Sequence, residues 1–163
     1  MESETPDDQL QRFWTQAQRH AHVGDLDVVM GTSWGESLVP PAWSFNGDAE
    51  DSDALLAQVL SGAKTAITGL AEEYDPDDDP LPRKGDLSIL LDAEGTPRAL
   101  LRTTKVVVVP FGDIEVDQAI AEGASDLDSW REAHRTFWEQ QSYEITDSTK
   151  VVWERFTVVY QES

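Results

Sequence analysis

Residues 87–109 read LSILLDAEGTPRALLRTTKVVVV, and this stretch decides the fold. Its first five residues and the segment 98–109 are rich in aliphatic and β-branched side chains, which favour strands. Between them, Asp92-Ala93-Glu94-Gly95 combines residue types that tolerate the backbone angles of a turn. The stretch therefore predicts a β-hairpin with a long second strand.

The rest of the chain adds further strands and several helices. Residues 151–160 read VVWERFTVVY, which predicts a strong closing strand, and residues 64–70 resemble a shorter strand. Apolar residues recur at helical spacing in four segments, about 5–19, 52–61, 115–122 and 127–141. This mixed order of elements predicts an α+β fold.

Three segments are predicted to lie outside this framework. Gly, Pro and scattered aromatic residues in 24–47 predict a long, largely irregular connection, with a short strand at 27–30. The acidic run 72–80 lacks the spacing of a calcium-binding EF-hand loop, so we expect a solvated loop. An acidic segment, 1–11, leads into the first helix.

The composition restricts the partners of the protein. The 163 residues carry 32 acidic and 12 basic side chains, a net charge of −20, which disfavours binding to a long nucleic acid duplex. The chain has no cysteine and three histidines, so we expect no metal and no cofactor. No apolar run approaches the ~20 residues that span a bilayer, and the N-terminus differs from a secretory signal. We therefore expect a cytoplasmic protein that does not bind membranes.

The segment Gly62-Ala63-Lys64-Thr65 superficially suggests a phosphate-binding loop. Such a loop needs glycines that let successive amides converge on a phosphate after a strand. Here Gly62 follows a predicted helix and is its expected C-terminal stop. We therefore reject this interpretation.

An ordered series of short motifs resembles the ASCH domain. The motifs occupy residues 13–14, 43–48, 60–66, 81–86, 109–111, 121–123, 130–134 and 154–156. The resemblance spans 12–160 and implies a single domain there. It implies a β-barrel similar to that of PUA domains, flanked by helices, with a cleft at one side. It also implies an association with RNA and modified nucleosides.

Some members of this family resemble N4-acetylcytidine amidohydrolases, in which a lysine, a threonine and a later glutamate cleave an acyl amide. Lys64 matches the lysine, but Ile67 and Ala124 stand where such a hydrolase has its threonine and glutamate. On a regular strand Thr68 lies ~13 Å from Lys64, so a bulge or turn is needed to bring them together. The candidate catalytic residues are Lys64, Thr65, Thr68 and Glu122.

Six residues are candidates for ligand binding: Lys64, Arg102, Trp43, Phe45, Trp130 and Arg155. Trp43 and Phe45 are predicted to form an aromatic lid. Trp130 either stacks on a base or belongs to the core, and His134, on the same helical face, is expected to be structural. Glu154 and Arg155 point to opposite faces of their strand, so one of them faces the core or cleft.

Three functional hypotheses follow. The first is binding of a nucleobase, nucleoside or short single-stranded RNA in a cleft beside the barrel. The alternatives are a hydrolase acting on N4-acylated cytidine or on RNA, and a protein-interaction domain without a small ligand. Five basic residues fall within 23 positions, and a face shared with Lys64 would make a local positive cleft. They are Arg83, Lys84, Arg98, Arg102 and Lys105.

Overall fold

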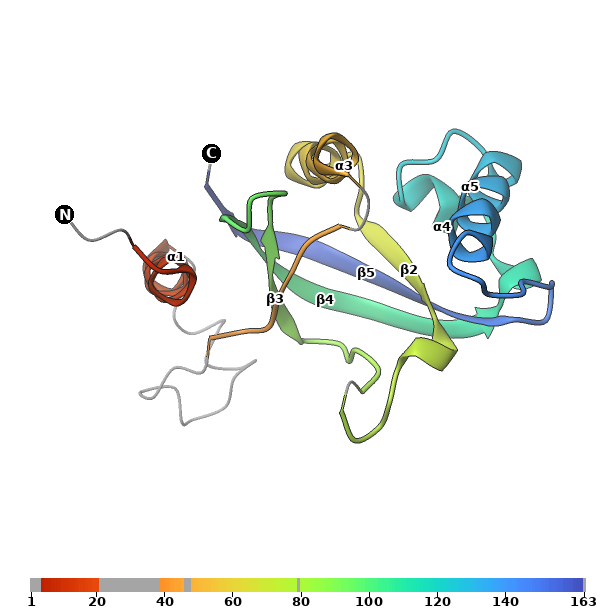
Figure 1. Ribbon diagram of the computed structural model, residues 1–163, viewed down its shortest axis with the longest axis horizontal. Helices are drawn as coiled ribbons and strands as arrows, with labels where there is room; N and C mark the ends of the chain where they lie inside the picture. The colour runs from red at the N-terminus through yellow and green to blue at the C-terminus, as the bar shows by residue number, and fades with distance from the viewer. Residues whose placement is uncertain (1–3, 21–38, 46–47, 79, 163) are drawn as a thin grey trace. The chain divides into compact units, whose positions relative to one another are not determined.

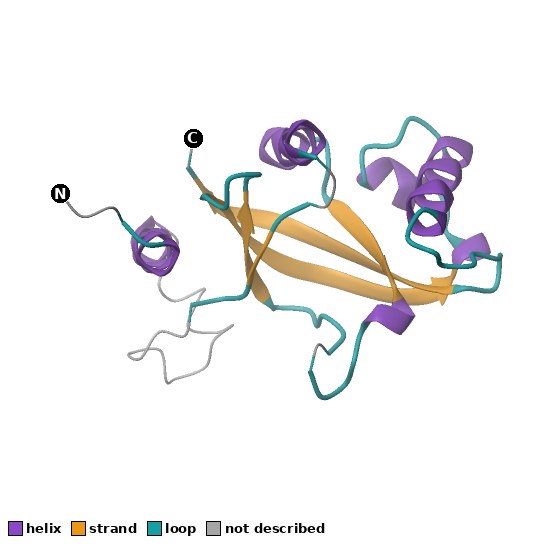
Figure 2. Cartoon of the chain, in the orientation of Figure 1, coloured by secondary structure: helices purple, strands orange, loops and turns teal. Residues whose placement is uncertain are grey.

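The computed structural model describes residues 4–20, 39–45, 48–78 and 80–162, and these residues form a mixed α+β fold (Figure 1). The helices are α1 (Pro6–His20), α3 (Ala49–Ser61), α4 (Val116–Ala121) and α5 (Leu127–Glu139). The strands, orange in Figure 2, are β1 (Ala42–Trp43), β2 (Ala66–Leu70), β3 (Leu87–Leu91), β4 (Pro97–Pro110) and β5 (Lys150–Gln161). The predicted fold class, the hairpin, the closing strand and the four helices are confirmed. The predicted strand at 27–30 lies outside the described residues.

The strands form one five-stranded sheet in the order β1-β3-β4-β5-β2. β3 pairs with β4 and β2 with β5, both antiparallel, whereas β1 runs parallel to β3. The sheet is open in the described part of the chain, so the predicted closure into a barrel is wrong. Alternating apolar residues predict strands, but the same alternation occurs in open sheets and in barrels.

Short-range sequence signals explain where the helices begin and end. Thr5 and Asp8 exchange backbone-to-side-chain hydrogen bonds of 3.1 and 3.2 Å at the start of α1. Asp126 accepts a 2.7 Å hydrogen bond from the Ser129 amide at the start of α5. Gly62 follows α3 with a φ of +87°, a conformation that glycine adopts without strain, so it is the predicted helix stop.

The chain divides into two compact units, and β4 and β5 run through both. The first comprises Met1–Ser61, Gly85–Arg102 and Thr157–Ser163, and the second comprises Gly62–Lys84 and Thr103–Phe156. In the first unit, Phe13, Trp14 and Ala17 of α1 pack against apolar side chains of β3 and β4. These three residues are 2% exposed or less, so α1 is held by its apolar face.

In the second unit, α4 and α5 lie side by side over one face of the strands (Figure 1). Ala66 and Leu70 of β2 and Val151 and Trp153 of β5 form the sheet side of this core. Thr68 lies between Ala66 and Leu70 on the same face, because side chains alternate along a strand and the β2–β5 register is continuous. A threonine therefore faces the helices within an apolar layer.

Two local features differ from the sequence prediction. β1 is a two-residue strand within the region predicted to be irregular, since two residues are too short to show a period. β2 begins at Ala66 rather than at Lys64. The Thr65 amide donates to the Ala121 carbonyl over 2.7 Å, and the Thr65 carbonyl accepts from the Phe156 amide over 3.0 Å. This junction turns Lys64 out of the strand.

The second core allows a matched test of packing. Val151 of β5 is fully buried, whereas Val108 of β4 is 44% exposed, and both lie in the second unit. We expect Val151→Ala to lower the free energy of unfolding by about 2 kcal/mol, because it removes buried methyl groups and leaves a cavity. Val108→Ala is expected to cost less than about 0.5 kcal/mol. Urea unfolding measures both values, and equal losses would contradict this packing.

Candidate functional site

Four side chains of the second unit converge on the carboxylate of Glu122, and together with it they form what we call the Glu122 cluster. The Thr68 hydroxyl and the Trp130 indole N–H each donate a 2.6 Å hydrogen bond to Oε2 of Glu122. Oε1 lies 3.8 Å from Lys64 Nζ and 3.4 Å from His134 Nε2. Lys64 Nζ also donates a 3.0 Å hydrogen bond to the Glu122 carbonyl. Two basic groups and two neutral donors thus surround one carboxylate.

Lys64 and Thr68 reach the cluster from the two ends of one short segment. Lys64 lies in the turn between Gly62 and β2, and Thr68 lies on the helix-facing side of β2. The turn therefore supplies the change of direction that a regular strand lacks. Both side chains meet Glu122, one at each carboxylate oxygen.

The end of α4 presents Glu122 to the cluster. Glu122 is the C-cap residue, and Gly123 follows it with a φ of +94°. The Ala124 amide donates to the Ala119 carbonyl and the Gly123 amide to the Ile120 carbonyl, which is the hydrogen-bond pattern of a Schellman motif. This motif places an apolar contact two residues after the cap, and Ala124 packs there against the core. The inward carboxylate therefore stands at 122 and not at 124.

Trp130 and His134 come from α5, one turn apart on the same face. Their rings stack with centroids 4.3 Å apart, and Phe111 stacks on Trp130 at 5.4 Å. Trp130 is 1% exposed, whereas the His134 side chain keeps 23% of its surface. His134 is thus the most accessible of the cluster's three ionisable side chains.

Burial changes the ionisation of the two central groups. Lys64 is 7% exposed and Glu122 is 5% exposed. Loss of hydration lowers the pKa of the Lys64 ammonium, and the charge of Glu122 offsets this only in part. Burial would raise the pKa of Glu122, but the hydrogen bond and charge of His134, with smaller contributions from Lys64 and Thr68, hold it below its ordinary value. The cluster therefore stabilises a buried carboxylate.

The His134 imidazole contacts a polar group with each of its ring nitrogens. His134 Nδ1 lies 2.9 Å from the Trp130 carbonyl, which only accepts, so Nδ1 carries a hydrogen. Nε2 faces Oε1 of the Glu122 carboxylate at 3.4 Å. The imidazole therefore bridges the Trp130 carbonyl and the Glu122 carboxylate.

Three of the four candidate catalytic residues lie in this cluster: Lys64, Thr68 and Glu122. Thr65 does not, because its hydroxyl donates a 3.3 Å hydrogen bond to the Ala121 carbonyl. Ile67 pairs with Glu154 on the opposite face of the sheet from Thr68. A threonine at 67 would point away from Glu122, so this departure from the family pattern does not remove a hydroxyl from the cluster. Catalytic roles for these residues remain a prediction.

The candidate ligand-binding residues are divided between the two units. Trp43, Phe45 and Arg102 belong to the first unit. The Trp43 indole donates a 3.1 Å hydrogen bond to Ser88 and meets Phe45 edge-on, with ring centroids 5.0 Å apart. Lys64, Trp130 and Arg155 belong to the second unit. The burial of Trp130 disfavours stacking of its ring on a base, so in the cluster it acts as a hydrogen-bond donor and packing group.

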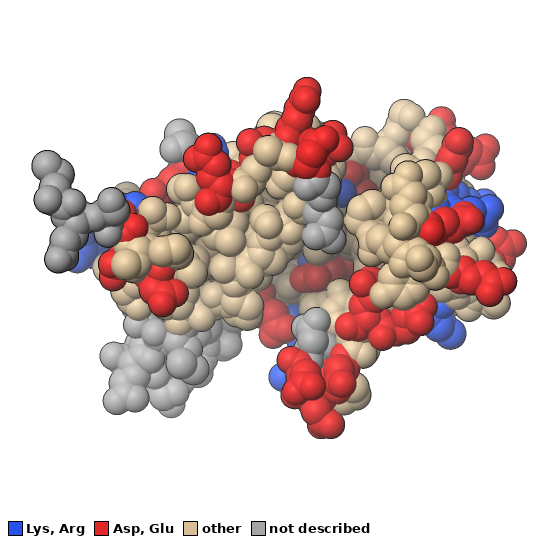
Figure 3. All heavy atoms as spheres, in the orientation of Figure 1, with Lys and Arg blue, Asp and Glu red and all other residues tan. Residues whose placement is uncertain are grey.

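The five clustered basic residues are also divided between the units: Arg98 and Arg102 lie in the first, and Arg83, Lys84 and Lys105 in the second. Arg98 pairs with Asp92 at 3.7 Å. Lys64 is buried against Glu122, so it shares no exposed positive face with the others. Acidic side chains (red) cover more of the surface in view than basic ones (blue) (Figure 3).

Sequence reasoning did not assign His134 to a site and treated it as structural. A signal was available, since Trp130 and His134 are spaced i, i+4 on an amphipathic helix and both carry polar ring atoms.

Among residues 4–20, 39–45, 48–78 and 80–162, no three His, Cys, Asp or Glu side chains form a metal-binding group. No helix in these ranges is long and apolar enough to cross a membrane.

A model of the ASCH domain family matches residues 41–160. Protein EF3133 from Enterococcus faecalis V583, assigned to the DUF984 family, has a known crystal structure, and its sequence is 29% identical to that of this chain. The match covers 83% of this chain and 88% of that one, with a TM-score of 0.69. The crystal structure of the ASCH domain from Lactobacillus crispatus JV V101 has a sequence 24% identical to this chain. The match covers 90% of this chain and 96% of that domain, and its TM-score of 0.69 supports the fold. No curated protein matches the chain.

The lowered pKa of Glu122 makes the stability of the cluster depend on pH. Because the folded pKa is below the ordinary 4.5, the ionised carboxylate stabilises the fold above pH 4.5, and this contribution is lost as pH falls through the folded pKa. We expect Glu122→Gln to lower the free energy of unfolding by about 3 kcal/mol at pH 7, because it leaves Lys64 buried without its counter-charge. The loss should shrink as the pH falls below 4.5.

Denaturant unfolding of both proteins between pH 3 and pH 7 measures this difference. Glu132→Gln is the matched control, since Glu132 is an exposed glutamate of α5. Lys64→Met combined with Glu122→Gln should recover part of the stability, because no buried charge is then left unpaired. A loss that is independent of pH would show that Glu122 is not ionised in the fold.

Proposed function

The chain belongs to the ASCH domain family, and from this premise we propose that it binds a nucleobase, a nucleoside or a short single-stranded RNA segment at the Glu122 cluster. The observation that carries the proposal is the convergence of Lys64 and Thr68 on Glu122. These are the residue types that the family resemblance implies for a functional site. They come together although two positions of the sequence motif are changed.

The chemistry of the cluster suits the edge of a nucleobase. Such an edge places N–H donors next to carbonyl acceptors, and a polar site recognises it with groups of both kinds. Lys64 provides a donor, the Thr68 hydroxyl keeps acceptor lone pairs while it donates to Glu122, and His134 offers a partly exposed imidazole. The buried charges are already balanced inside the cluster, so a neutral base fits better than a phosphate.

A single lysine substitution tests the binding proposal. Calorimetric titration with cytidine, N4-acetylcytidine and short single-stranded RNAs should reveal saturable binding by the wild-type protein. Loss of a hydrogen bond from a charged donor costs about 1.5–3 kcal/mol, so Lys64→Met should weaken binding about 10- to 100-fold. Lys84→Met, which removes an exposed lysine of the same unit, is the matched control.

The titration also separates the alternatives. Flat traces with every ligand, from protein whose folding is verified by circular dichroism, would overturn the proposal. Equal affinity of the wild-type and Lys64→Met proteins would place the ligand elsewhere. Flat traces would leave the third hypothesis, a protein-interaction domain, as the remaining prediction from the sequence.

One contact favours amide hydrolysis as a second function. The Thr68 hydroxyl lies 2.6 Å from a carboxylate that is ionised at neutral pH, which is the arrangement of a nucleophile and its general base. In this mechanism Glu122 takes the hydroxyl proton as Oγ1 attacks the acyl carbonyl. The amide C–N bond then breaks, and the proton passes to the leaving amine. A water molecule, deprotonated by Glu122, hydrolyses the acyl-threonine ester and restores both groups.

Two threonine variants test the hydrolase mechanism. Incubation of the protein with N4-acetylcytidine, followed by chromatography, measures release of cytidine. Thr68→Val should reduce the rate at least about 1,000-fold, because it removes the nucleophile and retains the shape of the side chain. Thr65→Val is the control and should retain activity, since its hydroxyl bonds only to a backbone carbonyl among the described contacts. Turnover that survives Thr68→Val would overturn the mechanism. Absence of turnover by the wild-type protein would leave ligand binding as the remaining proposed function.

A further inference from the structure

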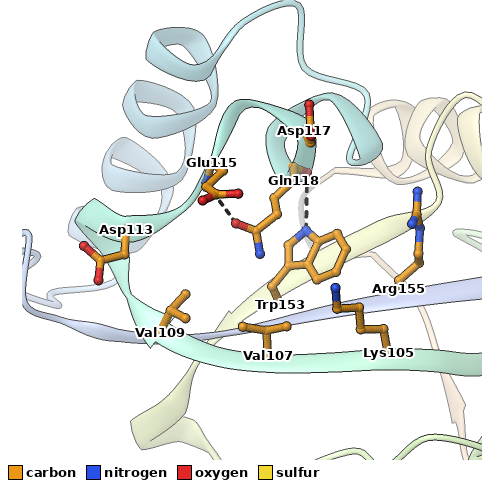
Figure 4. A pocket seen from close by; sticks show the side chains of 9 residues that line it. All are labelled: Lys105, Val107, Val109, Asp113, Glu115, Asp117, Gln118, Trp153 and Arg155. Carbon is orange, nitrogen blue, oxygen red and sulfur yellow. Dashed lines mark hydrogen bonds between the residues drawn. The ribbon is translucent and has the colours of Figure 1, made fainter.

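The second unit contains a pocket of about 410 Å³ that shares no residue with the Glu122 cluster (Figure 4). Its walls come from β4, β5, the segment that leads into α4, and α4 itself. The lining residues are Lys105, Val107, Val109, Asp113, Glu115, Asp117, Gln118, Trp153 and Arg155. The volume lies within the range of small-molecule sites, about 300–1,000 Å³.

Opposite charges line different parts of this pocket. Lys105 and Arg155 lie on the two central strands at one end, and in Figure 4 their charged groups point toward the side on which α4 lies. Asp113 and Glu115 lie between the end of β4 and the start of α4, and Asp117 lies in the first turn of α4. None of the five forms an ion pair with another described residue. The Glu115 side chain also accepts the capping hydrogen bond of α4 from the Gln118 backbone. The pocket thus holds two cations and three carboxylates, none of which is ion-paired with another described residue.

An apolar floor separates the two charged regions. Val107 and Val109 of β4 and the indole of Trp153 lie between the basic pair at one end and Asp113 and Glu115 at the other (Figure 4). Asp117 lies apart from these two, beside Gln118 on α4. The Trp153 N–H donates a 3.3 Å hydrogen bond to the Gln118 carbonyl, which fixes the ring beneath α4. Gln118 is in turn held by a 2.8 Å hydrogen bond from the Glu115 amide to its Oε1. The floor and the acidic side are therefore preorganised.

The spacing of the charges favours an elongated ligand. The three carboxylates do not gather as a metal-binding group among the described residues. Lys105 and Val109 are four positions apart on β4, ~13 Å along a strand, and Asp113 and Glu115 follow Val109 in the chain. A ligand that meets both charged regions thus needs an anionic and a cationic end about that far apart.

The charge of the whole protein selects among such ligands. At a net charge of −20, the surrounding field repels anions, and the three carboxylates outnumber the two cations of the pocket. A nucleotide brings negative charge and a neutral base, so the carboxylates gain no counter-charge from it. A zwitterion brings a cation for the carboxylates and an anion for Lys105 and Arg155, with no net charge.

We propose that this pocket binds a short peptide with free ends. Its terminal ammonium faces Asp113 and Glu115, its terminal carboxylate faces Lys105 and Arg155, and an apolar side chain covers Trp153. An extended tetrapeptide spans ~13 Å, which matches the distance along β4. This makes the pocket a second site, independent of the nucleoside site proposed above.

Peptides with blocked ends test the two charged contacts separately. The probe is Gly-Val-Phe-Gly with both ends free, followed by calorimetry or by NMR of the tryptophan indole signals. Its N-acetyl and its C-terminal amide forms should each bind at least about fivefold more weakly, because each loses one charge pair. Lys105→Gln should weaken the free peptide about fivefold and leave the affinity of the amide form unchanged. Lys84→Gln, an exposed lysine outside the pocket, should change neither.

Three results would overturn the proposal. The first is that the free peptide fails to bind to folded protein. The second is that the blocked peptides bind as well as the free one. The third is that cytidine 5′-monophosphate binds in a Lys105-dependent manner and the peptide does not. The last result identifies a nucleotide pocket. Because Lys105 and Trp153 lie outside the Glu122 cluster, failure here leaves the Lys64 titration unaffected.

Discussion

The buried carboxylate of Glu122 is the constraint on which the second unit depends. A carboxylate that is 5% exposed is strongly destabilising unless donors and counter-charges replace its hydration. Here the replacement comes from the segment around β2, through Lys64 and Thr68, and from α5, through Trp130 and His134. One side chain at the end of α4 therefore fixes a strand, a turn and a helix with respect to each other.

The same contacts that stabilise the carboxylate would also serve the proposed hydrolysis. A base that is held ionised by its neighbours, with a hydroxyl 2.6 Å away, needs no rearrangement to accept a proton. The cost is access, because the Glu122 side chain keeps only 2% of its surface and the His134 side chain keeps 23%. A ligand at the proposed site would therefore meet His134 and Thr68 first and would reach Lys64, whose side chain keeps 9% of its surface, deeper in the cluster.

Local patterns predicted most of the fold, and their limits are physical. Apolar spacing located four helices, the hairpin and the closing strand, but closure of a sheet depends on which edges pair, and alternation carries no information about that. In the site, counting along the motif assigned the threonine to 67 and the glutamate to 124. The pleat of β2 favours 68, and the Schellman motif at Gly123 turns Glu122 inward and Ala124 into the core. Three-dimensional geometry, rather than residue types, was the missing information.

The positions of the basic residues show which ligands a protein of net charge −20 can favour. A positive cleft would need several cations on one face, yet Lys64 is neutralised by Glu122 and Arg98 pairs with Asp92. Lys105 and Arg155 remain together, but they share their pocket with three carboxylates. The two proposed sites are thus close to charge balance inside a repulsive field. Both proposed sites consequently favour ligands without net charge, and selectivity rests on where donors, acceptors and apolar surface lie rather than on attraction of a polyanion.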